Sequence, residues 1–218
     1  MSLLTVGEAA ERLGISPRQV QHLVAQGHLR QIARGVVDET SVDRVVAVRG
    51  TGHGRAWAEP TAWGAVAILS GSQAEWMGAS QRSRLRTRLR GLSSTQLVER
   101  ARNRAVAFSY AGHPASLPRL RGEIVDTSPA SAALGLAATA TVDGYVTVGE
   151  LDAVVHRHGL VRDDDGQVTL RATSMDLAVV RALAETAVTL AALDLAGSLD
   201  SRGRHAGLAA LDRALERL

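Results

Sequence analysis

The sequence predicts a mainly α-helical protein with small β-structure, an α+β fold, in which a small N-terminal domain precedes a larger helical and α+β domain. The chain has 218 residues, which is more than one typical domain and less than two large ones. Hydrophobic residues make up 45% of it, enough for a substantial core. A glycine-rich stretch marks a linker at 51–56, so we expect domains at 1–50 and 57–218.

Residues 5 to 27 predict two short helices. Thr5-Val6-Gly7-Glu8 has the spacing of a capping box, which starts the first helix, and Gly14 ends it. Ser16-Pro17 then supplies an N-cap and a proline at the first helical position, and Gly27 closes the second helix. Two short helices joined by so tight a turn form a helix-turn-helix.

A hairpin is expected next. Residues 29–32 and 36–38 predict two short strands around Ala33-Arg34-Gly35, and Thr40 or Ser41 is expected to cap a third helix. A hairpin in this position is the wing of a winged helix-turn-helix, which we therefore predict for residues 1–50. The alternative is a small helical subdomain with an exposed polar face.

This order of residues resembles the excisionase-like and MerR-like winged helix-turn-helix family, over the stretch LTVGEAAERLGISPRQVQHLVAQGHLRQIARG. The resemblance implies that the second helix enters the major groove of double-stranded DNA and that the wing touches the adjacent backbone. The implied base contacts are Arg18, Gln19 and His22, and the implied phosphate contacts are Ser16, Arg30 and Arg34. Independently, arginine can pair bidentately with guanine and glutamine with adenine, and a helix N-terminus favours phosphate.

Charge divides the chain unevenly. All 25 basic residues are arginine, and the formal net charge is +1 over 1–50, +8 over 51–122 and −6 over 123–218. The second domain therefore has a basic helical part, 57–122, and an acidic α+β part, 123–218. A basic middle suggests a polyanion partner, and an acidic end suggests a protein partner.

The basic part is expected to contain three helices. The first starts at Glu59-Pro60-Thr61, where proline suits the first turn. The second is capped by Ser80 and docks through a stripe of leucines, Leu85, Leu89 and Leu92. A third helix begins at Ser94 and is expected to present Arg100, Arg102 and Arg104, before a short strand around Phe108.

Eight arginines within residues 82–104 would form a field that holds phosphates and adds salt-dependent affinity. The additional phosphate contacts expected there are Arg84, Arg86 and Arg90. A solvated helix face and a contact with an acidic protein surface are the alternatives.

The acidic part predicts a strand, a helix and a hairpin. A strand ends at Thr147, where Thr147-Val148-Gly149-Glu150 is a second capping-box match, and residues 160–162 and 168–171 are expected to pair across Asp163–Gly166. This arrangement would form a second winged unit. The aspartates lack the alternating ligands of an EF-hand, so we expect no calcium. From Ser174 a long apolar helix should run past Ala191 to a break at Gly197, as a core element or a dimerisation face.

Several function classes are excluded by composition. Without Cys or Lys there is no disulfide, thiolate nucleophile, cysteine-bound zinc, Walker A loop or Schiff base. No GxSxG, HExxH or spaced carboxylate pair occurs, and Gly50–Gly54 is more typical of a joint than of a nucleotide fingerprint. We therefore expect no enzyme, cofactor or metal site. No signal-like start or 18-residue apolar run occurs, so a cytoplasmic bacterial protein without membrane contact is expected.

The leading hypothesis is a sequence-specific DNA-binding transcriptional regulator. The two-part layout also resembles DNA-binding antitoxins of AbiE-type (type IV) toxin–antitoxin systems. That resemblance implies an autoregulating repressor with a nucleotidyltransferase-like toxin as partner. The alternatives are an excisionase-type architectural factor and a protein-interaction module whose acidic C-terminal region binds a toxin or another basic partner. A second copy of the chain, in a homodimer, is a further candidate partner.

Overall fold

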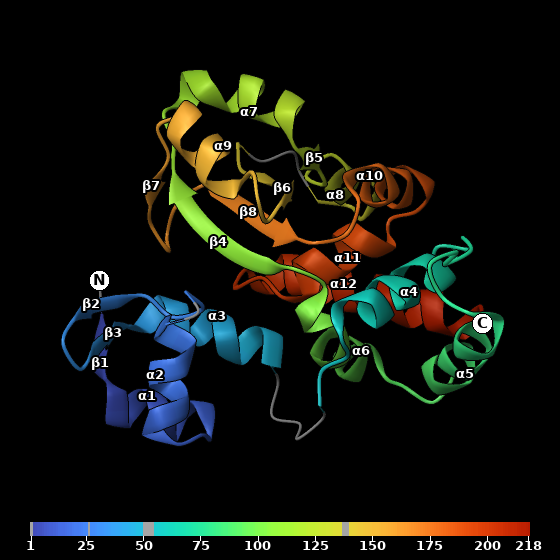
Figure 1. Ribbon diagram of the computed structural model, residues 1–218, viewed down its shortest axis with the longest axis horizontal. Coiled ribbons are helices and arrows are strands. Elements are labelled where there is room, and N and C mark those ends of the chain that lie inside the picture. Colours follow the sequence, from blue (N-terminus) through green and yellow to red (C-terminus); the bar gives the residue numbers. More distant parts are fainter. Residues whose placement is uncertain (1, 26, 50–54, 137–139) are drawn as a thin grey trace.

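The computed structural model describes residues 2–25, 27–49, 55–136 and 140–218 and contains the α+β architecture that the sequence predicts (Figure 1). Most of the predicted linker, and the glycine pattern at 50–54, lie outside the described residues. None of the helices in the described ranges is long and apolar enough to cross a membrane.

The N-terminal domain combines three helices with a small antiparallel sheet in the order β1-β3-β2. Its elements are β1 (Leu3–Thr5), α1 (Val6–Leu13), α2 (Pro17–Ala25), β2 (Gln31–Ala33), β3 (Val36–Asp38) and α3 (Glu39–Arg49). Its core is formed by Ala9, Ala10, Val20, Leu23, Leu29, Val37 and Val42. Strand β1, which the sequence analysis did not predict, pairs with β3 and so joins the start of the chain to the wing.

Local signals in this domain fold as expected, with one correction. Thr5 and Glu8 form the capping box, and the hydrogen bonds from the Thr5 amide and hydroxyl lower the pKa of the Glu8 carboxyl. Gly14 and Gly27 have positive φ values, 63° and 75°, as the last turn of each helix requires. The third helix begins at Glu39 and not after a cap at Thr40 or Ser41. The reason is that the Asp38 carboxylate accepts a hydrogen bond from the Ser41 amide at 3.0 Å.

The second domain is built on a five-stranded sheet with helices on both faces. The first half contains α4 (Glu59–Leu69), α5 (Ala79–Leu89), α6 (Ser94–Ala101), a 3₁₀ turn (Arg102–Arg104), β4 (Val106–Ala111), a 3₁₀ turn (Pro114–Ser116) and α7 (Leu117–Glu123). The second half contains β5 (Val125–Asp126), α8 (Ala130–Ala133), β6 (Val142–Thr147), α9 (Leu151–Arg157), β7 (Val161–Arg162), β8 (Val168–Thr173), α10 (Leu177–Thr186), α11 (Thr189–Ala196) and α12 (Ser201–Glu216).

The strands follow the order β5-β6-β8-β4-β7, in which β6 and β8 are parallel and the other pairs antiparallel. Helices α7 and α9 cover one face, and α4 and α10 to α12 lie on the other side (Figure 1). A core of Leu120, Ile124, Val146, Val154 and Leu170 lies under α7 and α9. The larger core, which includes Trp63, Leu89, Leu97, Tyr145, Leu193 and Leu211, joins α4, α5 and α6 to α11 and α12.

Three predictions about pairing and helix starts are wrong. Residues 160–162 and 168–171 do not form a hairpin, because β4 lies between β7 and β8 and pairs with both. No second winged unit is therefore formed. Thr147 is the last residue of β6 and does not cap the next helix, which starts at Leu151. The N-cap of α5 is Gly78, and not Ser80, so that helix starts earlier.

The long apolar helix expected from Ser174 is divided into two. Ala187 has extended backbone angles, φ −157° and ψ 159°, which end α10 and turn the chain into α11. Almost every residue of α11 is buried, and α11 packs closely along α12. The segment was expected to be either a core element or a dimerisation face, and α11 is a core element.

Candidate nucleic-acid interface

Helix α2 has one buried and one exposed face. Val20 and Leu23 are buried in the N-terminal core, whereas Arg18, Gln19 and His22 are exposed. At about 100° per residue, Arg18 and His22 each lie about 160° around the helix from Val20. The packing of α2 therefore places these two side chains together, directed away from the body of the domain.

Gln19 has a structural partner that the sequence analysis missed. Its Oε1 accepts hydrogen bonds from the Ser16 amide at 2.9 Å and the Ser16 hydroxyl at 3.1 Å, and the Gln19 amide donates to Ser16 Oγ at 3.3 Å. The spacing of Ser16 and Gln19 is that of a capping box, which was the available signal. A glutamine that pairs with adenine uses both its amide oxygen and nitrogen. Gln19 would have to break its hydrogen bonds with Ser16 before it could pair with adenine. The side chains of Arg18 and His22 take no part in this cap.

The wing positions the two remaining predicted phosphate contacts differently. Arg34 is exposed at the turn between β2 and β3, beside Gly35, whose φ of 79° the turn requires. Arg30 is half-buried, and its amide donates to the Ser41 hydroxyl at 3.2 Å. Arg34 is thus the wing cation with the greater reach toward a DNA backbone.

Helix α5 presents the arginine face that the leucine stripe predicts. Leu85 and Leu89 are buried, while Arg84, Arg86 and Arg90 are exposed. Arg84 donates to the Ser80 carbonyl at 3.2 Å, and Arg90 donates to the Leu218 carbonyl at 2.8 and 3.1 Å. Figure 1 shows α2 and α5 toward opposite ends of the long axis of the molecule. The two predicted sets of phosphate contacts therefore form separate surfaces.

The expected exposed row of Arg100, Arg102 and Arg104 is not formed. Arg104 is only 5% exposed, and its guanidinium donates to Asp194 Oδ1 at 2.6 Å and to the Tyr145 hydroxyl at 3.0 Å. The α-helix ends at Ala101, and the following 3₁₀ turn directs Arg104 into the core. Arg104 is drawn inward because its ion-pair partner is the buried carboxylate of Asp194, 90 residues later in the sequence.

Tyr145, Arg171 and Thr127 complete this buried network. The Tyr145 hydroxyl donates to Asp194 at 2.7 Å, and burial raises the pKa of Tyr145. Arg171 donates to both carboxylate oxygens of Asp143 at 2.7 Å.

Among the described residues, no cluster of three His, Asp or Glu side chains could hold a metal ion.

The comparison with known families concerns the N-terminal domain. Residues 3–46 match the model of a helix-turn-helix domain, and this range contains α1, α2, the wing and most of α3. No curated protein and no solved structure matches the chain. The helix-turn-helix predicted for the N-terminal residues is thus confirmed, and helix-turn-helix domains bind DNA.

Proposed function

From the helix-turn-helix domain at residues 3–46, we propose that the protein is a sequence-specific DNA-binding regulator of transcription without enzymatic activity of its own. The observation that carries this proposal is the exposed pair of Arg18 and His22 on α2, opposite the buried residue Val20. In helix-turn-helix proteins the second helix lies in the major groove and its N-terminal residues contact base edges.

In this arrangement Arg18 is the main base reader. Its guanidinium can donate two hydrogen bonds to O6 and N7 of a guanine, which discriminates against another base by about 1–3 kcal/mol. Arg34 on the wing would contact the neighbouring phosphates and fix the register of the domain without reading sequence. Ser16 would contribute through the N-terminus of α2, where the helix dipole favours a phosphate.

A finer proposal comes from the layout that resembles AbiE antitoxins. In it the protein represses its own operon and binds a nucleotidyltransferase-like toxin through the acidic region 123–218. An excisionase-type factor would use the same helix but would bend DNA and occupy adjacent sites cooperatively. A protein-interaction module would retain its protein partner after loss of residues 1–50, whereas the regulator would lose specific DNA binding.

The experiment is a selection of bound sequences from a randomised duplex pool, using the full chain. Wild type should enrich one motif that contains guanine, and Arg18→Ala should lose the preference at that base. Arg119→Ala serves as the matched control, because Arg119 is an exposed arginine on α7, outside the helix-turn-helix domain. Enrichment of no motif by the wild type would overturn the proposal.

A further inference from the structure

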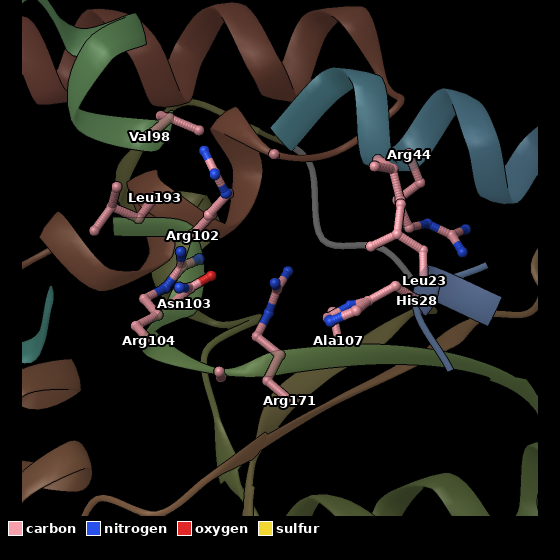
Figure 2. A pocket seen from close by; sticks show the side chains of 13 residues that line it. Leu23, His28, Arg44, Val98, Arg102, Asn103, Arg104, Ala107, Arg171 and Leu193 are labelled. Atoms are coloured by element: carbon pink, nitrogen blue, oxygen red, sulfur yellow. The ribbon is translucent and has the colours of Figure 1, made fainter. Parts of the chain in front are cut away.

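A cavity of about 120 Å³ lies between the helix-turn-helix domain and the second domain. The N-terminal domain contributes Leu23, His28, Arg44 and Val45 to its wall. The second domain contributes the segment from Arg102 to Ala105 together with Arg171. Figure 2 shows Arg171 standing in the opening, with Arg102 and Arg104 on one side and His28 on the other. Residues of both domains therefore line the cavity.

The wall of this cavity is basic. Arg44, Arg102, Arg104 and Arg171 line it, and none of its described lining residues is acidic. The carboxylates that pair with Arg104 and Arg171 are Asp194 and Asp143, and both line a different cavity, of about 410 Å³. These ion pairs are thus oriented with their positive ends toward the first cavity. Such an arrangement favours an anion there, and the low dielectric strengthens the effect.

Arg171 has N–H groups that its carboxylate partners do not use. The hydrogen bonds of Arg171 to carboxylates use Nε and Nη2, so Nη1 and its two N–H groups are not used by Asp143 or Asp194. Burial lowers the pKa of Arg102, although nearby Glu99 acts to raise it. Arg102 also donates to the Glu99 carbonyl at 3.0 Å and lines the same space, so an anion bound beside it would favour its charged form.

The remaining wall is apolar, which sets the size and nature of the occupant. Leu23, Val45, Val98 and Leu193 face the same space as the arginines. A volume of about 120 Å³ accommodates several water molecules, because one water needs on the order of 10–15 Å³ by the same measure. We propose that this cavity binds a small organic anion, whose carboxylate or phosphate group is held by Arg102 and Arg171 and whose carbon skeleton packs on the apolar wall.

Contacts around the cavity indicate what binding would do. Arg44 of α3 pairs with the buried Asp164 at 2.9 Å, and Arg162 of β7 donates to the Gly27 carbonyl at 3.2 Å. The Arg162 guanidinium also lies 4.9 Å from the ring centre of Phe108. The anion therefore sits where the two domains already touch, and its binding joins them more tightly. An effector bound here would act on the base of α2 without touching its DNA-reading face.

The test measures thermal stability of the full chain with inorganic phosphate and, separately, with succinate, at constant ionic strength. The melting temperature should rise saturably with at least one of them, and the more effective anion identifies the head group. Arg102→Gln should weaken the apparent affinity at least about tenfold, as expected for loss of a charge-assisted pair. Arg44→Gln provides a second variant, from the other domain, and should also weaken binding. Arg119→Gln, which removes the same charge outside the cavity, should bind like wild type.

Hydrogen exchange gives an independent readout of location. Phosphate or succinate should slow exchange in residues 27–29 and 102–107 together, because both segments border the cavity. No saturable rise in melting temperature with either anion would overturn the proposal. An equal rise in wild type and in both cavity variants would do so as well, since it would show general ionic stabilisation. No DNA is present, so a negative result leaves the proposed DNA binding standing.

Discussion

Replacing Asp194 by asparagine should destabilise the second domain more than any surface substitution. The Asp194 carboxylate is 3% exposed and accepts from Arg104 at 2.6 Å, Tyr145 at 2.7 Å and Thr127 at 3.1 Å. Arg171 Nε lies 3.2 Å from the same carboxylate. Asp194→Asn would leave two arginine cations with Asp143 as their remaining carboxylate, and unpairing a buried ion pair costs about 3–5 kcal/mol.

The assay is urea denaturation followed by circular dichroism, with thermal melting beside it. For a chain of this size, a loss of about 3–5 kcal/mol should lower the melting temperature by about 6–20 °C. Glu216→Gln removes an exposed carboxylate near the end of α12 and should change stability by less than about 0.5 kcal/mol. A loss below about 1 kcal/mol for Asp194→Asn, the value of an exposed pair, would refute the view that this network is buried and coupled.

Three smaller predictions concern the domain junction, the first helix and the arginine face. Gly27→Ala should destabilise the protein more than Gly35→Ala, as measured by urea midpoints. Both residues have positive φ, but only at position 27 would an added Cβ lie 3.1 Å from the ring of Phe108. Because the pKa of Glu8 is lowered, the contribution of its carboxylate to folding stability is complete above pH 4.5 and is lost as the pH falls through the lowered pKa. Glu8→Gln should remove this step from a measurement of the free energy of unfolding against pH. Arg86→Ala should reduce the slope of log affinity against log salt by about 0.9 for a lost phosphate contact, and Arg119→Ala should not.

The N-terminal domain could be predicted because its signals are local. The capping residues Thr5 and Glu8, the Ser16-Pro17 start and the glycines that end α1 and α2 each act within four residues of the chain. Strand β1 could not be predicted in this way, because three residues show no period and their partner strand begins 31 residues later.

The second domain was harder to predict because its determinants are distant in sequence. The strands β7 and β8 look like a hairpin, but β4 inserts between them from more than 50 residues earlier. Arg104 fits an exposed basic row until Asp194, 90 residues later, gives it a buried partner. The Arg-rich face of α5 was predicted, since Leu85 and Leu89 fix its orientation through helical spacing alone.

The most direct test of base reading by α2 is fluorescence anisotropy with a selected duplex and a shuffled duplex of the same composition, at one salt concentration. Wild type should prefer the selected duplex, and Arg18→Ala should weaken that binding by about 1–3 kcal/mol while leaving the shuffled duplex nearly unchanged. Equal weakening on both duplexes, or no weakening on either, would contradict the assignment of Arg18 as a reader of bases.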